Sequence, residues 1–205
     1  MYIPEFARME DVEEQRDFLR RQSFGILFSW ASDTQPWVSH LPMLLREDVG
    51  TMGVLTGHMA VVNQQWRDLD NHPVLAVFPG PHAYISPNWY EVMTVPTWNY
   101  VAVHVYGTFR LTEGDVALAD MEDMVRLYEP DSPLLDLLQE PVYQAHRKGV
   151  AGFRIEVERI EGKKKLSQNK TPATRTRVIE ALRSDRRDAA QEVADWMERT
   201  LREER

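Results

Sequence analysis

An alternation of apolar and polar side chains between residues 101 and 111 is the clearest pattern in the sequence. Odd positions from Val101 to Leu111 carry mostly apolar side chains, whereas even positions from His104 to Arg110 carry polar ones, Tyr106 among them. Successive side chains of a strand point to opposite faces, so this period of two predicts a strand with one face in a core. The other face, which carries an imidazole and a phenol, is expected to be wetter.

Three further apolar stretches come earlier in the chain, at residues 24–30, 37–45 and 51–59. Polar turn sequences separate them at short spacing, which predicts an antiparallel meander. Pro42 lies inside the second stretch and has no N–H to give to a neighbouring strand. We therefore expect a bulge or a sheet edge at this place, with exposed backbone near His40.

The sequence predicts more strands further along. Residues 74–78 form an apolar run of the buried type, and residues 79–82, Pro-Gly-Pro-His, are typical of a tight turn. Together with a second strand at residues 83–86, they predict a hairpin. Residues 152–160 return to the alternation of a strand.

Helical patterns lie at both ends of the chain and in one insertion. Residues 9–21 have a narrow apolar stripe, residues 63–70 suit one or two helical turns, and residues 113–128 and 133–146 predict two helices. One or two more helices are expected from residue 174 to the end. Strands and helices do not alternate, which disfavours a doubly wound parallel sheet. We expect a mainly β (α+β) fold, a small closed or partly closed antiparallel barrel with helical additions.

The length of 205 residues favours one domain, or one domain with an appendage. We expect a barrel domain over residues 1–170 with a helical insertion at about residues 113–146, and a C-terminal helical extension over residues 171–205 packed on it. The chain has no cysteine, which excludes disulfides, thiolate metal sites and a cysteine nucleophile. With no basic and then apolar N-terminus and no membrane-length segment, a cytoplasmic protein without membrane contact is expected.

The formal net charge of −8 argues against a protein that binds nucleic acid with its whole surface. The charge is uneven, because residues 163–187 hold nine Lys and Arg residues against Glu180 and Asp185, which leaves +7. If the protein contacts DNA, this basic segment has to provide the contact. No convincing helix-turn-helix pattern accompanies it.

A polar and aromatic corner comes just before the strand at residues 101–111. Pro96 fixes the backbone, and four residues then offer two hydroxyls, an amide and two ring faces. They are Thr97, Trp98, Asn99 and Tyr100. Such a cluster at the mouth of a strand indicates a pocket for a planar, polar ligand. The alternative is that both rings belong to the core and Asn99 to a turn.

A second cluster combines cations with hydrogen-bonding side chains. Ser167, Gln168 and Asn169 lie between Lys165 and Lys170. A phosphate group needs charge-assisted hydrogen bonds beside a cation, so this stretch predicts a phosphate site. The alternative is a solvated basic loop before a helix.

Two segments hold weaker candidates, residues 39–42 and residues 57–60, the latter followed by Asn63 and Trp66. A single histidine on a strand is more often part of the packing than a ligand. The six histidines show no metal-binding spacing, so no metal site is predicted. The sequence also lacks a glycine-rich nucleotide loop and a nucleophile elbow.

Several of these segments follow one another in an order that spans most of the chain. They are residues 1–4, 40–42, 57–60 with Asn63 and Trp66, 80–87 with 89–90, 95–100 with 103–104, and 165–170. Together they resemble the PaiB-type FMN-binding negative transcriptional regulator family, which is similar to other flavin-binding split barrels. The resemblance implies an FMN-binding split β-barrel that forms a homodimer, with FMN at the subunit interface.

The resemblance also suggests which residues contact FMN. The isoalloxazine ring is expected to stack on Trp98 or Tyr100, at about 1–3 kcal/mol per contact. The predicted phosphate carriers are Lys165, Ser167, Gln168 and Asn169, with His58 and Asn63 as second contributors. His40 and Pro42 are expected to line the ring edge, and Met59 and Asn99 complete the predicted site.

One position departs from the family pattern. After Gly-His-Met-Ala the family has Arg or Lys, whereas this chain has Val61. If that cation normally faces the phosphate, FMN binding is expected to be weaker or lost here.

Two functions compete on this resemblance. The first is negative regulation of transcription, with the protein as a flavin or redox sensor. The alternative is an FMN-dependent oxidoreductase that takes electrons from a nicotinamide. Haem binding or degradation, with a histidine as axial ligand, is a third function that related barrels perform. Because the same lysines cannot easily serve both FMN phosphate and DNA phosphate, indirect regulation is favoured. No catalytic residue is assigned.

Overall fold

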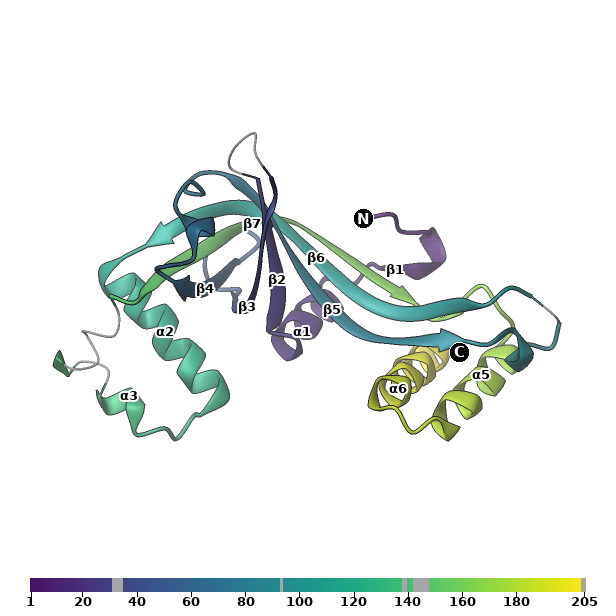
Figure 1. Cartoon of the computed structure of the whole chain (residues 1–205). Coiled ribbons are helices and arrows are strands. Elements are labelled where there is room, and N and C mark those ends of the chain that lie inside the picture. Colours follow the sequence, from purple (N-terminus) through teal and green to yellow (C-terminus); the bar gives the residue numbers. More distant parts are fainter. Residues whose placement is uncertain (31–34, 93, 138–139, 142–147, 204–205) are drawn as a thin grey trace. The chain divides into compact units, whose positions relative to one another are not determined.

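The computed structural model describes residues 1–30, 35–92, 94–137, 140–141 and 148–203. Its main element is an antiparallel sheet of seven strands (Figure 1). The strand order is β1-β7-β4-β3-β2-β5-β6, and a further pairing between β7 and β6 closes all strands except β1 into a ring. The fold is therefore α+β with a ring-like sheet, which confirms the predicted fold class.

The strands are β1 (Arg8–Met9), β2 (Phe24–Ser29), β3 (Trp37–Arg46), β4 (Val54–Ala60), β5 (Pro73–Ile85), β6 (Thr97–Thr112) and β7 (Val150–Lys165). The helices are α1 (Val12–Arg21), α2 (Gly114–Tyr128), α3 (Leu134–Leu137), α5 (Pro172–Ser184) and α6 (Asp188–Glu203), with 3-10 helices η1 (Glu5–Ala7), η2 (Gln64–Trp66) and η3 (Pro87–Trp89). Within the described part of the chain, no helix combines the length and the apolar character needed to cross a bilayer.

The chain forms two compact units, and each is described by itself. The terminal unit consists of Met1–Gln15, Pro79–Val103 and Glu161–Arg205, and the ring unit consists of Arg16–Phe78 and His104–Ile160. β5, β6 and β7 each contribute residues to both units. The domain division expected near residue 170 stays a prediction.

The ring unit contains the core of the sheet. β2 pairs with β3 and β5, and β4 pairs with β3 and β7, all antiparallel. The rings of Phe109 and Phe153 stack inside it with centroids 4.9 Å apart. Gly107 lets β6 and β7 approach closely, because a Cβ atom there would lie 2.1 Å from the carbonyl oxygen of Glu156.

Helix α2 lies against β4, and ion pairs join it to the sheet, Arg46 on β3 with Asp123 and Arg154 on β7 with Asp120. The guanidinium of Arg154 on β7 donates from Nε and Nη2 to the two oxygens of Asp120, each at 2.8 Å. Asp120 is almost fully buried. This bidentate geometry satisfies a buried carboxylate, which would otherwise oppose folding.

In the terminal unit, α5 and α6 pack against each other. Their buried side chains include Val178, Leu182, Val193 and Met197. Helix α5 begins at a proline and is capped by Thr171, whose hydroxyl accepts a hydrogen bond from the Thr174 N–H at 3.2 Å. β1 pairs with the end of β7, with Arg8 opposite Lys163.

The alternation predicted for residues 101–111 is confirmed, because Val101, Val103, Val105 and Phe109 are buried. The hairpin predicted around residues 79–82 is wrong, because β5 runs unbroken from Pro73 to Ile85. Prolines stop a ladder only where their N–H is needed. The pairing of β2 with β5 ends at Val77, and Pro79 and Pro81 lie beyond it, so they fit an extended strand.

Two other predictions need comment. Pro42 does not lie on an edge strand, because β3 pairs with β2 on one side and β4 on the other. Pro42 forms the last residue pair of β3 with β2, opposite Phe24, and Met43 forms the first pair of β3 with β4, opposite Gly57. The missing N–H of Pro42 therefore lies where β3 changes from pairing with β2 to pairing with β4. Of the helix predicted at residues 133–146, the structure has α3, and residues 138–139 and 142–147 lie outside the described residues.

Candidate functional site

The terminal unit brings the aromatic corner and the basic cluster together. The corner begins β6, and Lys165, the first residue of the basic cluster, ends β7. The Lys165 ammonium donates to the hydroxyl of Thr97 and to the carbonyl oxygen of Trp98, the latter at 2.8 Å. These bonds fix the amine beside the corner.

A hollow of about 170 Å³ opens at this junction. It is lined by Phe6, Tyr90, Thr94, Val95, Thr97, Asn99, Lys165, Ser167, Asn169 and Lys170. Pockets that enclose drug-sized ligands measure about 300–1,000 Å³. This hollow therefore suits a small polar group such as a phosphate, and not a whole flavin.

A buried polar network forms one wall of the hollow. Asn99 is fully buried, and its Nδ2 donates to the Ser167 hydroxyl at 3.0 Å and to the sulfur of Met197 at 3.4 Å. The Ser167 hydroxyl donates back to Asn99 Oδ1 at 3.2 Å, and the Tyr90 hydroxyl lies 3.4 Å from it. Asn99 and Ser167 thus hold β6, α6 and the loop after β7 together.

The side chain of Gln168 also bonds within its own loop. Its Oε1 accepts from the Leu166 N–H at 2.6 Å, and its Nε2 donates to the carbonyl oxygen of Lys164. Between them, Ser167 has a positive φ of 64°, which this closed loop stabilises. Asn169, by contrast, is exposed and lines the hollow. The phosphate roles of all four predicted carriers stay predictions.

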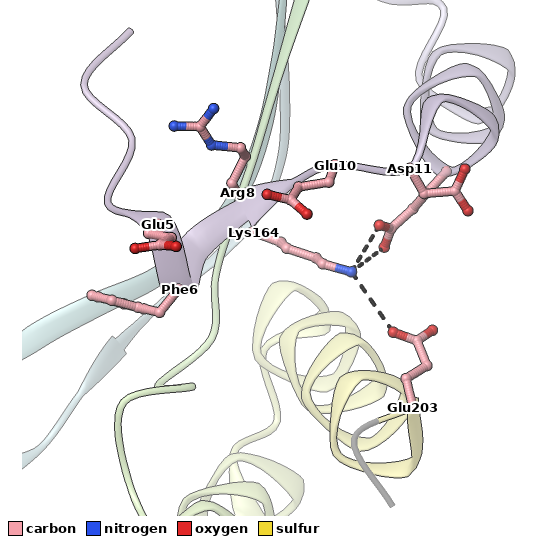
Figure 2. A pocket seen from close by; sticks show the side chains of 8 residues that line it. Glu5, Phe6, Arg8, Glu10, Asp11, Lys164 and Glu203 are labelled. Atoms are coloured by element: carbon pink, nitrogen blue, oxygen red, sulfur yellow. Dashed lines mark hydrogen bonds and ion pairs between the residues drawn. The ribbon is translucent and has the colours of Figure 1, made fainter.

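Strand alternation separates the three consecutive lysines at the end of β7. Lys163 and Lys165 share one face and Lys164 points to the other. Figure 2 shows Lys164 reaching toward acidic side chains. Its ammonium lies 2.7 Å from a carboxylate oxygen of Glu14 and 3.7 Å from one of Glu203.

That second face carries a wider hollow of opposite character. It has a volume of about 770 Å³. Its lining consists of Glu5, Phe6, Arg8, Glu10, Asp11, Glu14, Lys164 and Glu203 (Figure 2). Carboxylates outnumber cations there, so an anionic ligand is disfavoured on that face.

Lys163 and Lys165 have different surroundings from Lys164. Lys163 is 6% exposed, donates to the Tyr2 carbonyl oxygen at 2.9 Å, and lies 5.5 Å and 5.1 Å from the ring centroids of Tyr2 and Tyr100. Desolvation and the positive charge of Lys163 lower the pKa of Lys165 below its ordinary value. Among the described residues, neither of these two lysines forms an ion pair with a carboxylate.

An aromatic cluster borders the same junction. Trp98 is 50% exposed, and its ring lies 6.1 Å from that of His82 and 6.0 Å from that of Tyr84, both on β5. Tyr100 is only half-buried, but Lys163 lies over its ring. Of the two predicted stacking residues, Trp98 therefore has the more accessible ring face.

The remaining predicted residues lie in the ring unit. His40 is exposed beside the ring of Phe24, with centroids 6.4 Å apart, and Pro42 is half-buried on the same strand. Burial lowers the pKa of His58 on β4 below its ordinary value. Met59 is 2% exposed and packs in the core, which leaves its side chain little surface for a ligand.

Asn63 forms local hydrogen bonds. Its Nδ2 donates to the Ser39 hydroxyl at 2.8 Å, and its Oδ1 accepts from the Gln65 N–H at 2.9 Å, which caps η2. In the same loop the Trp66 indole donates to the Val61 carbonyl oxygen at 3.1 Å, while the Val61 side chain is exposed. Val61 thus offers an apolar surface at the position where the family resemblance led us to expect a cation.

Comparison with known proteins decides the family. Residues 1–159 match the family model described as "Putative FMN-binding domain". This chain belongs to that FMN-binding domain family. This chain is also 37% identical over 208 residues to "Protease synthase and sporulation protein PAI 2" of Bacillus subtilis (strain 168), and the match covers 100% of both chains. An uncharacterized protein of Emericella nidulans is 26% identical over 95% of each chain.

Solved structures show the fold of this family member. The flavocytochrome Anf3 from Azotobacter vinelandii superposes with a TM-score of 0.62 at 12% identity, covering 80% of this chain and 72% of that one. The FAD and heme binding protein from Mycobacterium smegmatis gives a TM-score of 0.61 at 13% identity, with coverage of 78% and 73%. These similarities confirm the split-barrel fold expected from the family resemblance.

The sequence analysis did not assign three side chains to this candidate site. They are Lys163, His82 and Tyr84. Lys163 was counted only as part of a basic segment, and His82 was placed in a turn. His82 and Tyr84 are two residues apart on β5 and share a face, a signal that the proline-based turn prediction concealed. Lys163 and Lys165 show the same spacing on β7.

Proposed function

We propose that this protein binds FMN at the junction of β6 and β7 in the terminal unit. The ligand phosphate enters the small hollow beside Lys165 and Asn169, and the isoalloxazine ring stacks on Trp98. The observation that carries this proposal is a pair of lysines that have no carboxylate partner among the described residues and lie beside an exposed aromatic cluster. Membership of a family described as FMN-binding supports it.

The energies of the two kinds of contact are consistent with a phosphate held in the hollow and a ring stacked on Trp98. A charge-assisted hydrogen bond contributes about 1.5–3 kcal/mol, and stacking on one aromatic side chain about 1–3 kcal/mol. Together they reach the micromolar range only if several contacts form at once. The phosphate anchors the ligand, and the ring adds contact area.

We further propose a homodimer with FMN at the subunit interface. A hollow of about 170 Å³ accepts the phosphate end alone, so the ring lies on the surface of the terminal unit. A second chain would cover the ring's free face and remove it from water. Light scattering of the protein with and without FMN tests this, and a strictly monomeric FMN complex would reject it.

A flavin titration tests the proposed site. FMN and riboflavin are each titrated into the Lys165→Ala/Asn169→Ala variant, and ligand fluorescence is followed. We expect a loss of FMN affinity of at least tenfold, equivalent to about 1.4 kcal/mol, with riboflavin affinity little changed. Lys164→Ala is the matched control, since it removes the same charge from the acidic face.

Unchanged FMN affinity in the double variant would remove the phosphate assignment. If the wild-type protein does not bind FMN, the proposed function is rejected. The apolar side chain of Val61 in place of a cation would then be the first explanation to test. In that case, Val61→Arg should restore binding if the missing cation is the cause.

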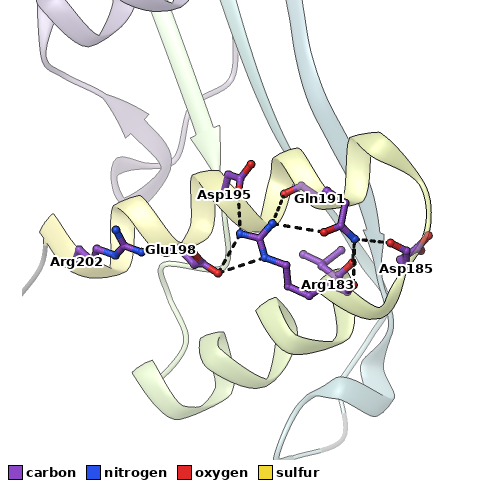
Figure 3. A network of polar contacts seen from close by, with 7 residues as sticks. Arg183, Asp185, Gln191, Asp195, Glu198 and Arg202 are labelled. Atoms are coloured by element: carbon purple, nitrogen blue, oxygen red, sulfur yellow. Dashed lines mark hydrogen bonds and ion pairs between the residues drawn. The ribbon is translucent and has the colours of Figure 1, made fainter.

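We propose that any role in regulating transcription is indirect. Several cations of the +7 segment are buried or have an acidic neighbour: Arg175 is 1% exposed, and the Nε of Arg187, whose side chain is 67% exposed, lies 3.0 Å from Asp185. Figure 3 shows Arg183 between Asp195 and Glu198, with nitrogen–oxygen distances of 2.5 Å and 3.1 Å. Tight promoter binding that weakens steeply with salt would overturn this proposal.

The flavin spectrum in the presence of NADH or NADPH tests the competing function. FMN bands that bleach under a nicotinamide and recover in air would make the protein an oxidoreductase. Bands that persist support a sensor that responds to flavin occupancy.

A further inference from the structure

Lys163 is a buried cation in the terminal unit. Its side chain is 6% exposed, and its hydrogen bond goes to a neutral acceptor, the carbonyl oxygen of Tyr2. The rings of Tyr2 and Tyr100 lie 5.5 Å and 5.1 Å from its ammonium nitrogen and offer their negative faces. A buried lysine ordinarily needs a carboxylate to offset its lost hydration.

Lys164, the next residue, has the carboxylate partners that Lys163 lacks among the described residues. Lys164 lies on the opposite face of β7 and is held by Glu14 and Glu203. Lys163 instead lies two residues from Lys165, whose ammonium also bonds to neutral oxygens, those of Thr97 and Trp98. The two positive charges repel each other, and desolvation together with Lys163 lowers the pKa of Lys165. An anion placed near both would remove this repulsion.

We propose that Lys163 is a further binding residue, which forms with Lys165 a two-cation site for a dianionic phosphate monoester. The inference rests on the proposed function in so far as the monoester is the phosphate of FMN. Lys165 lines the hollow and contacts the phosphate, and Lys163 acts from behind it through its charge. Thr97 is a positioning residue, because its hydroxyl holds the Lys165 ammonium.

The charge of the ligand follows from this arrangement. A phosphate monoester has a second pKa of about 6 and carries close to two negative charges on one phosphorus at pH 7. Each phosphorus of a pyrophosphate diester carries one. One cation in contact with the phosphate and a second positive charge nearby thus favour FMN over FAD, and both ligands over riboflavin.

The experiment compares Lys163→Gln with Lys164→Gln, neighbours that lose the same charge from opposite faces. The affinities of FMN, FAD and riboflavin are measured for each variant by calorimetry. We expect Lys163→Gln to weaken FMN roughly tenfold, the size of one lost charge-assisted interaction, and to reduce the preference for FMN over FAD. Riboflavin affinity should not change, and Lys164→Gln should leave all three affinities at the wild-type value.

Two outcomes would overturn the inference while FMN binding itself stands. One is equal FMN affinity in the two variants. The other is an equal loss of FMN and riboflavin in Lys163→Gln, which would show a structural role. Thr97→Val should weaken FMN and Thr97→Ser should restore it, a rescue that packing alone would not give.

Inorganic phosphate separates failure of this inference from failure of the proposed function. If the wild-type protein binds no FMN, the proposed function is rejected, and the lysine pair is judged by phosphate protection of Lys165 against reductive methylation. Protection in the wild type that falls about tenfold in Lys163→Gln supports the two-cation site. Absence of protection in the wild type overturns it.

Discussion

The two units of this protein treat buried charge in opposite ways. In the ring unit, Arg154 and Asp120 form a bidentate pair with both bonds at 2.8 Å. In the terminal unit, Lys163 is about as well buried as Asp120, yet its hydrogen-bond acceptor is an uncharged carbonyl oxygen. A paired buried charge serves folding, whereas a charge left without its counter-ion has the electrostatics of a binding site.

Breaking the paired charge should have the largest effect on stability. Asp120→Ala leaves the Arg154 guanidinium without its carboxylate at a mostly buried place. We expect a loss of about 2–3 kcal/mol in the free energy of unfolding, less than for a fully buried pair because Arg154 is partly exposed. Urea denaturation measures it. Asp115→Ala, an exposed position of the same helix, is the control. A loss below 0.5 kcal/mol, the size of an ordinary surface change, would contradict this account of the pair.

Removing the aromatic surface of the terminal unit should affect binding and not stability. Trp98→Ala is expected to weaken FMN by about 1–3 kcal/mol, the value of one stacking contact. The free energy of unfolding should stay nearly constant, because half of the Trp98 surface is exposed. Fluorescence titration and urea denaturation are measured on the same sample. If stability falls and FMN affinity does not, Trp98 is a packing residue.

Neutralising the paired lysine should have a small effect on stability alone. Lys164→Gln removes the ion pair with Glu14, whose side chain is 17% exposed, and the longer one with Glu203. We expect a loss of up to about 1 kcal/mol in the free energy of unfolding, typical of pairs near the surface. The effect should shrink at high salt in a thermal melt. A change insensitive to salt would indicate lost packing instead.

The smallest expected effect is a pH dependence of the ring unit. Burial lowers the pKa of His58 below 6.5, so the unfolded state binds its proton more readily. The stability that neutral His58 contributes is therefore complete above pH 6.5 and is lost as the pH falls through its folded pKa. His58→Gln should make the free energy of unfolding less dependent on pH between about 7.5 and 5, as measured by urea denaturation. An unchanged slope would assign the dependence to other groups.

The sequence predicted those parts of the fold that depend on local periodicity. The alternation from Val101 onward defines β6 because one face of the strand is buried, and α2 follows from its apolar spacing in the same way. The path of β5 was mispredicted at Pro79 and Pro81 because a proline is compatible with a strand wherever no neighbour needs its N–H. That condition depends on the length of β2, which the proline residues themselves do not reveal.

The candidate site was predicted less completely, for a physical reason. Ser167 and Gln168 have the composition of phosphate ligands, but their side chains bond to Asn99, Leu166 and Lys164. Spacing cannot tell whether a polar atom will find its partner in the protein or in a ligand. Lys163 was overlooked because three consecutive lysines look alike until strand direction assigns them to faces.

The continuity of β7 determines where this gene product can be divided. The family match ends at residue 159, whereas β7 runs from Val150 to Lys165 without a break. A fragment cut at the end of the match would lose the C-terminal end of β7, which includes Lys163 and Lys165, and the whole of α5 and α6. Expression or domain-swapping work on this family therefore has to take its boundary from the strand and the two helices that follow it, not from the limits of the sequence profile.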